Sequence, residues 1–220
     1  MYFKITNKNE NHHGFQYKDG LNILDKKFDD NPENSCAPGG LYFTTKEFIH
    51  KFYKFGIYLR IVELPIDDPE FRMVNTDGDK WRANKIILKE RYFLSDPSIY
   101  TKFDIGQLGF AWSCYNDNPK IIEHLVKENV NISDNALKDY ILWWACKHGY
   151  LEVAKFSVEN GANIHATTDH ALWLASSNGH LEIVKLLINK GANVDADNGC
   201  ALLYALKNGH EEVVKLLMEK

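Results

Sequence analysis

The 220-residue sequence lacks the features of several protein classes. It contains no apolar run close to the roughly 18–20 residues of a membrane-spanning helix, and its N-terminus has no hydrophobic signal-peptide segment. It also lacks a basic excess, because 26 Lys and Arg stand against 30 Asp and Glu, a formal net charge of −4. Nucleic-acid binding needs clustered cations that neutralise phosphates. We therefore expect a cytoplasmic protein with neither a membrane nor a nucleic acid as its partner.

Cysteine is scarce and scattered. The four residues include no CxxC pair, and they are Cys36, Cys114, Cys146 and Cys200. Zinc sites need clustered ligands and disulfides need an oxidising compartment, so we expect four reduced thiols and no metal. Nothing in the sequence predicts a cofactor.

Residues 1–104 contain 18 of the 28 aromatic side chains and show no internal repeat. Thr45 is expected to cap a helix that runs to about Phe55, because the apolar positions between them follow helical spacing. Asp19-Gly20 and Asp77-Gly78 are turn dipeptides. Short apolar or alternating runs predict strands at residues 1–5, 15–17, 21–24, 41–43, 57–64 and 85–94. This region is therefore predicted to be an α+β domain, a mostly antiparallel sheet with one main helix.

One segment of this domain offers a candidate for chemistry. Gly39-Gly40 leads into the predicted strand that carries Tyr42 and then into the predicted helix. The segment resembles part of the ADP-ribosyltransferase-like domains. That resemblance implies that Tyr42 stacks on nicotinamide, that His12 or His13 holds the ribose, and that Glu63 polarises a hydroxyl. The alternative is that the glycines allow a tight backbone path and that Tyr42 fills the core. We favour the alternative, because Glu63 lies in no recognisable catalytic motif.

Two further polar clusters fit structural roles better than chemical ones. His12 and His13 could form a metal or nucleophile site with Cys36 or His50, but neighbouring side chains on an extended loop point to opposite sides. An acidic group lacks the ligand spacing of a calcium loop, and turn chemistry explains part of it. Its members are Asp67, Asp68, Asp77 and Asp79. We predict no catalytic and no metal-binding residue.

The second half of the chain repeats with a period of 30 residues. Residues 179–187 (GHLEIVKLL) correspond to residues 149–155 (GYLEVAK) and to residues 209–217 (GHEEVVKLL). Residues 161–164 (GANI) recur as residues 191–194 (GANV) at the same spacing. A fixed period in this range is typical of stacked units that bury their apolar faces on one another.

These motifs identify the second half as ankyrin repeats. The whole chain resembles the ankyrin-repeat proteins that amoebal giant DNA viruses of the mimivirus type encode in large families. The resemblance in the first half rests on residues 39–43 (GGLYF) and 84–88 (NKIIL). It implies an all-α ankyrin solenoid after the α+β domain and a protein-binding role in the infected cell, and it supplies no catalytic residue.

We divide the second half into about four repeats, at residues 105–131, 132–163, 164–193 and 194–220. The first is degenerate, and we expect its face to dock on the N-terminal domain with Trp112 as a buried wedge. Where ankyrin proteins carry Thr-Pro-Leu-His, this sequence has YILW, HALW and CALL at residues 140–143, 170–173 and 200–203. The first helices should therefore depend on packing more than on capping, and the hairpin finger should be shortened.

A protein partner would contact the concave face of such a stack. We predict that its residues lie at the ends of the first helices and at the finger tips, and they are Lys147, His148, Ser177, Asn178, Lys207, Asn208, Thr167, Asp169, Asp197 and Asn198. Trp143, Trp144 and Trp173 are expected to pack between first helices. His148, His180 and His210 are expected to support the turns.

The last repeat is incomplete and has no polar capping helix. An apolar face should stay partly open, formed by Val213, Val214, Leu216 and Leu217. We interpret the chain as a piece of a longer array, and self-association through this face as the alternative. The sequence as a whole predicts a non-enzymatic interaction module that recruits a protein partner. The alternative function is a divergent nucleotide-using N-terminal domain that the repeats target.

Overall fold

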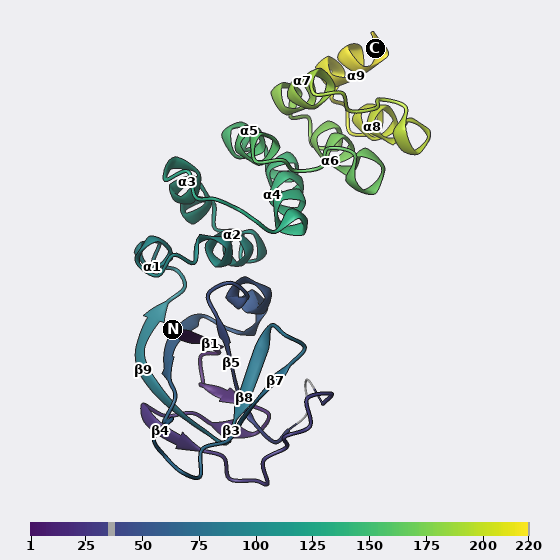
Figure 1. Cartoon of the computed structure of the whole chain (residues 1–220). Helices are drawn as coiled ribbons and strands as arrows, with labels where there is room; N and C mark the ends of the chain where they lie inside the picture. The colour runs from purple at the N-terminus through teal and green to yellow at the C-terminus, as the bar shows by residue number, and fades with distance from the viewer. Residues whose placement is uncertain (35–37, 220) are drawn as a thin grey trace. The chain divides into compact units, whose positions relative to one another are not determined.

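The computed structural model describes residues 1–34 and 38–219, so Cys36 lies outside the described residues. The contacts within the chain divide it into two compact units, Met1–Ile121 and Ile122–Lys220, and each is described by itself (Figure 1). The first unit is built on a sheet, and the described residues of the second form helices without strands. The predicted boundary after residue 104 stays a prediction.

Among the described residues of the first unit, seven strands form one antiparallel sheet in the order β4-β9-β6-β1-β5-β8-β7. They are β1 (Tyr2–Thr6), β4 (Gly20–Ile23), β5 (Leu41–Thr45), β6 (Tyr58–Glu63), β7 (Met73–Thr76), β8 (Lys80–Ala83) and β9 (Lys85–Phe93). A separate small hairpin pairs β2 (Asn11–His12) with β3 (Phe15–Gln16). The predicted antiparallel sheet is confirmed.

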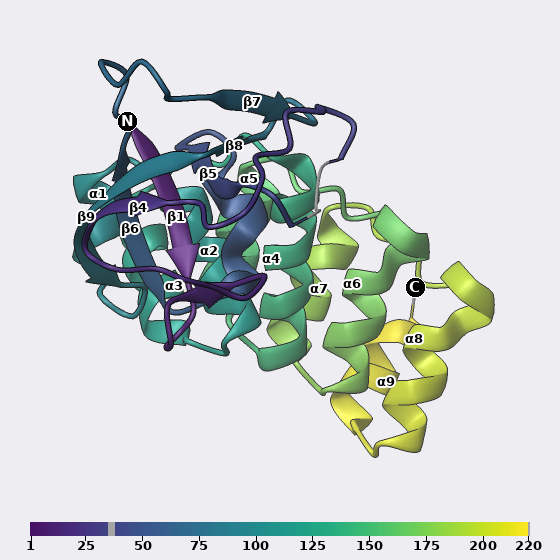
Figure 2. The same ribbon diagram turned by 90° about the horizontal axis from the view of Figure 1, so that it is seen from below.

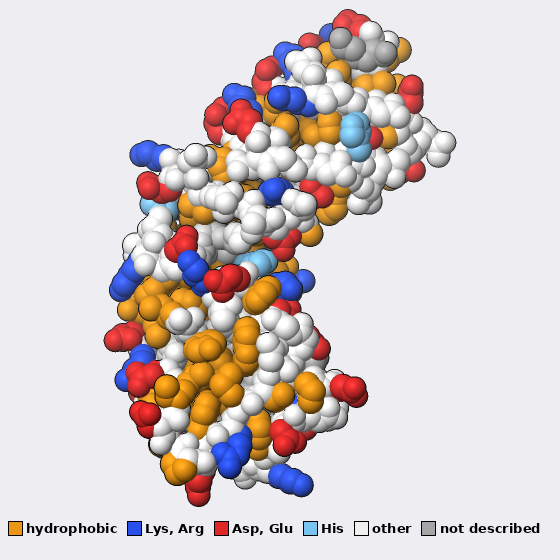
Figure 3. All heavy atoms as spheres, viewed as in Figure 1, with side chains coloured by type: hydrophobic (Ala, Val, Ile, Leu, Met, Phe, Trp, Pro, Cys, Tyr) orange, Lys and Arg blue, Asp and Glu red, His pale blue; other side chains and the backbone are white. Residues whose placement is uncertain are grey.

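The core of this unit is aromatic and aliphatic. Its buried cluster joins strands far apart in sequence and consists of Tyr17, Leu41, Phe43, Val62, Ala83, Ile86 and Leu88. Hydrophobic side chains also gather on the surface of the sheet in Figure 3, and Ile23, Ile66 and Phe93 are each more than half exposed. Burial of apolar area contributes about 25 cal/mol per Å² and stabilises the packing of this cluster.

The sequence missed β7 and β8 because a charged side chain occupies the interior there. Arg82 of β8 is fully buried, and its guanidinium donates to the backbone oxygens of Asn31 (2.6 Å) and Asn34 (2.7 Å). A Cβ at Gly40 would lie 2.7 Å from the Arg82 side chain, so only glycine fits. Tyr42 and Phe43 are buried. The expected tight backbone path at Gly40 and the burial of Tyr42 and Phe43 are therefore confirmed.

The predicted helix from Thr45 to Phe55 is wrong in its start and its type. Thr45 belongs to β5 and pairs with Tyr2, so its backbone stays extended instead of capping a helix. A 3₁₀-helix, η1 (Ile49–Phe55), follows, and no side chain caps it. The sheet register outweighs the local capping signal, because Thr45 ends β5 as the partner of Tyr2 and its backbone oxygen accepts from the Phe48 amide in a turn before η1.

Two helices complete the first unit, α1 (Ser98–Lys102) and α2 (Gly106–Tyr115). Helix α2 packs against η1, and the indole nitrogen of Trp112 donates to the backbone oxygen of Gly56 at 3.2 Å. Only 6% of Trp112 is exposed. The sequence prediction that Trp112 is a buried wedge against the N-terminal domain is therefore confirmed.

The division between the units falls within α3 (Pro119–Lys127), and helix pairs follow. They are α4 (Asn135–His148) with α5 (Leu151–Glu159), α6 (Ala166–Ser177) with α7 (Leu181–Asn189), and α8 (Ala196–Lys207) with α9 (Glu211–Met218). The first helices α4, α6 and α8 pack in sequence order, as Figures 1 and 2 show, and α7 contacts both α5 and α9. The predicted stack of helix pairs is confirmed.

The starts of the first helices differ from one another. In α4, the side chain of Asp134 accepts a hydrogen bond from the Leu137 amide at 3.0 Å, so the expectation that capping is missing is wrong there. No side chain caps α6 or α8. These two helices begin with three successive left-handed residues, Thr167–Asp169 and Asp197–Gly199.

Candidate protein-binding surface

The ten residues predicted to contact a partner lie at two opposite ends of the first helices. The tip group lies where α6 and α8 begin and consists of Thr167, Asp169, Asp197 and Asn198. The turn group lies where α4, α6 and α8 end and consists of Lys147, His148, Ser177, Asn178, Lys207 and Asn208. A helix of 12 residues is about 18 Å long, so the two groups do not form one patch.

A cavity of about 270 Å³ lies at the tip end, and α6 and α8 provide most of its lining. Thr167, Asp169 and Asp197 of the tip group line it, together with the rings of Trp173 and Tyr204. The cavity falls just below the size range of small-molecule pockets, about 300–1,000 Å³. It is large enough to receive one side chain of a partner.

Three consecutive left-handed residues are unusual outside glycine and cost roughly 1–2 kcal/mol each. At the tip of α6, Asp169 holds this turn. Its Oδ1 accepts a hydrogen bond from the Asn193 amide at 3.1 Å and lies 3.0 Å from Nδ1 of His165. Only 6% of Asp169 is exposed, so it positions the tip instead of facing a partner.

The same contact occurs one repeat earlier. Oδ1 of Asp139, 30 residues before Asp169, accepts from the Asn163 amide at 2.6 Å. Each carboxylate therefore ties its own first helix to the loop that leads into the next repeat. Gly199 takes this position in the last repeat. The sequence analysis missed this role, although the spacing of 30 between Asp139 and Asp169 was a visible signal.

A row of rings crosses the first helices beside the cavity. Trp143 contacts His170 (5.1 Å between ring centroids), His170 contacts Trp173 (4.8 Å), and Trp173 contacts Tyr204 (5.6 Å). Trp144 is buried and stacks on Tyr150 at 4.9 Å. The predicted packing of the tryptophans between first helices is confirmed for Trp143 and Trp173, whereas Trp144 packs within its own repeat.

The turn group contains a second type of inter-repeat contact. A Cβ at Gly149 would lie 2.6 Å from the His180 ring, and one at Gly179 would lie 2.5 Å from the His210 ring. Nε2 of His180 donates to the backbone oxygen of Lys147 at 3.2 Å. The predicted support of the turns by His180 and His210 is confirmed.

Ser177 and Asn208 take part in the same contacts. Nε2 of His210 and Nδ2 of Asn208 both donate to the backbone oxygen of Ser177, at 3.0 and 2.6 Å. These side chains hold adjacent repeats together. Lys147, Asn178 and Lys207 are exposed at this end of the stack, and His148 packs on Trp144.

The cysteines of the described chain are free thiols. Burial raises the pKa of Cys114 and of Cys146 well above its ordinary value. Cys200 donates a hydrogen bond to Asp197 Oδ2 at 3.3 Å, which raises the pKa of the Cys200 thiol. None of these three is activated as a nucleophile, because nucleophilic cysteines have a lowered pKa.

In the first unit, three residues of the transferase-like hypothesis meet at one cavity. The His12 and His13 rings lie 4.0 Å apart and both contact Tyr42. The expectation that the two histidines point to opposite sides is wrong, because His13 adopts a left-handed conformation (φ 50°) in a tight turn. Glu63 does not line this cavity and pairs with Lys89 at 2.9 Å.

Three of the four acidic residues considered as a cation site pair with a lysine, and one of these pairs is Asp77 with Lys80 at 3.4 Å. Asp68 lies 2.7 Å from Lys85 Nζ, and Asp79 lies 3.0 Å from Lys51 Nζ. The Lys85 ammonium holds the pKa of Asp68 below its ordinary value. No group of three His, Cys, Asp or Glu within residues 1–34 and 38–219 is placed to hold a metal ion.

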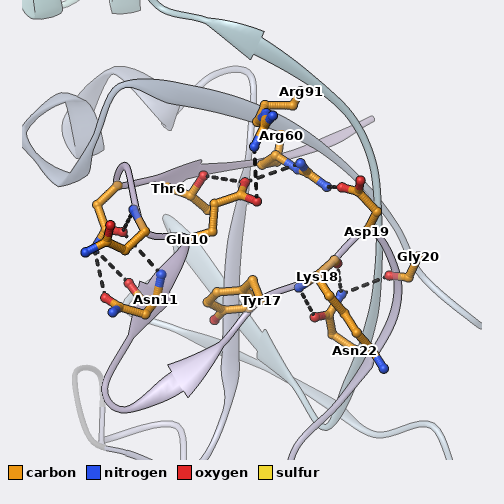
Figure 4. Close-up of polar contacts among 12 residues, drawn as sticks. Thr6, Glu10, Asn11, Tyr17, Lys18, Asp19, Gly20, Asn22, Arg60 and Arg91 are labelled. Carbon is orange, nitrogen blue, oxygen red and sulfur yellow. Dashed lines mark hydrogen bonds and ion pairs between the residues drawn. The ribbon is translucent and has the colours of Figure 1, made fainter.

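A buried charge network supports the start of the sheet. Figure 4 shows Arg60 of β6 between the carboxylates of Glu10 and Asp19. Arg60 is 1% exposed, and it pairs with Glu10 at 3.2 Å. Glu10 also accepts from the Thr6 hydroxyl at 3.1 Å. A buried guanidinium needs such partners to offset its loss of hydration, so this network is structural.

Comparison with known proteins agrees with the helix pairs. The family model for three copies of the ankyrin repeat matches residues 108–195 and 142–220. This chain belongs to the ankyrin-repeat family.

The ankyrin repeat protein R868 of Acanthamoeba polyphaga mimivirus is 46% identical over 166 residues, which are 75% of this chain and 70% of R868. The uncharacterized protein R869 of the same virus is 53% identical over 96 residues, 44% of this chain and 70% of R869. The ankyrin repeat protein R896 of that virus is 40% identical over 163 residues, 74% of this chain and 42% of R896.

The alignment with R868 is longer than the ankyrin half of the chain alone. The similarity to a mimivirus ankyrin protein therefore includes part of the N-terminal sheet, as the sequence resemblance implied. In residues 1–34 and 38–219, we find no helix that combines the length and the apolar character needed to cross a bilayer.

Proposed function

We propose that the ankyrin repeats recruit a protein partner through the tip end of α6 and α8. The cavity of about 270 Å³ beside Trp173 and Tyr204 carries this proposal. Aromatic residues dominate the energetics of protein interfaces when a partner buries them. The turn end is less suited, because Ser177, Asn208 and His210 are already bonded to one another.

The lining of the tip cavity favours a long cationic side chain of the partner. Asp197 is exposed, and the rings of Trp173 and Tyr204 lie beside it. A Lys or Arg side chain could place its methylene stem on these rings and its charge near the carboxylate. Asp169 would hold the tip in the conformation that binds.

The similarity to mimivirus proteins supports a role for the chain as a viral adaptor in the cytoplasm of the infected host cell. Ankyrin repeats are interaction modules, and the Cys200 thiol at the tip cavity has a raised pKa, the opposite of an activated nucleophile. We therefore infer a non-enzymatic function for the repeats.

The alternative is a nucleotide-using N-terminal domain. Tyr42, His12 and His13 do meet, but Glu63 is paired with Lys89 outside the cavity. A thermal-shift titration with nicotinamide nucleotides tests this alternative. A saturable stabilisation that Tyr42→Phe leaves intact and Tyr42→Ala removes would support it over the interaction module.

Affinity capture from host lysate with two matched double variants tests the proposed surface. The tip variant carries Asp197→Asn and Tyr204→Ala, and the turn variant carries Lys147→Glu and Asn178→Asp at two exposed residues. We expect the same partner with the unmodified chain and the turn variant, and at least tenfold less with the tip variant. Equal capture by the tip variant, with its fold verified by circular dichroism, would refute the assignment.

A further inference from the structure

The sheet of the first unit opens between β1 and β5. These strands pair at Tyr2 with Thr45 and at Phe3 with Thr44, and the ladder ends there. Beyond this point, both strands line a cavity of about 290 Å³. The β2–β3 hairpin contributes His12, and η1 contributes apolar side chains. All of these elements belong to the first unit.

Lys4 of β1 is the unusual residue in this lining. Only 6% of it is exposed, its Nζ donates to the backbone oxygen of Tyr42 at 2.9 Å, and it lies 4.4 Å above the Tyr17 ring. Within the described residues, no carboxylate lies within ion-pair distance of Lys4. A buried ammonium without an anion is costly, so burial lowers the pKa of Lys4 to about 7.

The Tyr42 contact explains only part of this arrangement. The backbone oxygen of Tyr42 accepts from Lys4 Nζ just beyond the last residue pair of β1 and β5. An ammonium has three N–H donors, and this bond uses one of them. A core built only for packing would fill the position with an apolar side chain of similar length.

The rest of the lining is apolar on one side and rich in donors on the other. The apolar side chains are Phe3, Ile5, Phe43, Ile49, Phe52 and Phe55. The polar side includes Lys4, His12, His13 and Lys80, and the described lining contains no Asp or Glu. Lys80 already has a partner in Asp77 at 3.4 Å. Burial, with Lys4 and His13 nearby, lowers the pKa of His12 to about 4, so that ring is neutral at pH 6.

We propose that this cavity binds a small monocarboxylate with an apolar body, whose carboxylate pairs with the Lys4 ammonium. The apolar body then lies on the rings of η1 and β5. At roughly 30 Å³ for each water of liquid volume, the cavity holds at least about ten heavy atoms, the size of octanoate. The ligand then supplies the anionic partner that the Lys4 ammonium lacks in the folded chain.

Isothermal titration of the full chain at pH 6 tests this proposal with octanoate as the probe and octanol as its uncharged match. We expect saturable octanoate binding that is at least tenfold tighter than octanol binding. Lys4→Met keeps the length of the side chain and removes the charge, so it should weaken octanoate at least tenfold and leave octanol unchanged. Lys46→Met, at an exposed residue paired with Asp104, should bind octanoate as the unmodified chain does.

Amide chemical shifts locate the site and verify that each variant is folded. Octanoate should move the signals of β1, β5 and η1. The proposal is overturned if octanoate fails to saturate the folded chain, if octanol binds equally well, or if Lys4→Met binds octanoate unchanged. It is also overturned if nicotinamide mononucleotide displaces octanoate and binds more tightly, because the cavity would then belong to the nucleotide-using alternative.

Discussion

Replacing Lys4 by methionine should change how the stability of the first unit depends on pH. Burial lowers the pKa of Lys4 from 10.5 to about 7 in the folded chain. Between these two values, the unfolded state binds more protons than the folded state, so the free energy of unfolding rises with pH. The cost of burying Lys4 is therefore largest below pH 7 and disappears as the pH approaches 10.5.

The slope from one such group approaches about 1.4 kcal/mol per pH unit. Integrated from pH 7 to pH 8.5, it amounts to about 1.6 kcal/mol that Lys4→Met should lack. Burial raises the pKa of Cys114 and of Cys146 above 9.0 in the folded state. The free energy of unfolding therefore falls with pH through these thiols, but only above about pH 9, where they ionise in the unfolded state. The window from pH 7 to pH 8.5 avoids this opposite effect.

At pH 7 itself, Lys4→Met should stabilise the unit by about 3 kcal/mol, because about 4 kcal/mol of charge burial disappears and the bond to the Tyr42 oxygen, about 1 kcal/mol, is lost. Urea denaturation followed by the NMR amide signals of β1 and β6 measures this difference at each pH. Lys46→Met is the control and should keep the slope of the unmodified chain. A difference between the unmodified chain and Lys4→Met that stays constant within about 0.5 kcal/mol from pH 7 to pH 8.5 would refute the reasoning.

Three further predictions concern the repeats. Gly179→Ala should destabilise the second unit by about 1–2 kcal/mol more than Gly209→Ala in thermal denaturation, since both have φ of 75° but only the Gly179 site meets the His210 ring. Asp169→Ala should cost about 1 kcal/mol and speed hydrogen exchange at the following loop, because the Asn193 amide loses its acceptor in a partly buried hydrogen bond; unchanged exchange there would contradict the assigned role. Leu206→Glu should abolish any increase in size with concentration in light scattering, because Leu206 is 56% exposed on α8; an increase that persists would exclude this face.

The exposed apolar surface of the last helix pair differs from the open face that the sequence predicts. Val213 and Leu217 are buried, at 1% and 5% exposure, whereas Val214 and Leu216 are partly exposed, so the expected face is open only at these two residues. The exposed apolar side chains of the last helix pair are instead Leu203, Leu206 and Met218. Self-association, if it occurs, should therefore use α8, and this stays a prediction.

The repeats were predictable because their signals are local. The turn glycines Gly149, Gly179 and Gly209 recur every 30 residues, and Gly149 and Gly179 are needed because the histidine of the next repeat packs on each of them. The left-handed tips were not predictable in this way. Thr167 and Thr168 have φ of 53° and 59°, a range that β-branched residues rarely adopt, so no local sequence pattern predicts this conformation.

The cavity at Lys4 could not be predicted from the sequence, for a different reason. Apolar and polar residues alternate in Met1–Ile5, and this pattern predicts a strand. Its partner β5 lies about 40 residues away, and the pairing ends after two residue pairs. Where a ladder ends depends on the register of both strands, which no local pattern encodes. The same holds for Arg60 and Arg82, whose burial depends on carboxylates and carbonyls supplied by distant loops.

The short repeat period and the tip surface have one physical cause. A unit of 30 residues has three fewer than the standard ankyrin unit of about 33, and three left-handed residues kink the chain at the tips of α6 and α8. A tight tip cannot reach outward to a partner as a long hairpin does. Recognition must then use what the tip leaves uncovered, which is the row of rings from Trp143 to Tyr204. Inserting three residues after Ala196 should therefore close the cavity beside Trp173 and reduce capture of the partner, while the helix pairs stay intact by circular dichroism. Undiminished capture would show that the rings are core packing and that the partner binds elsewhere.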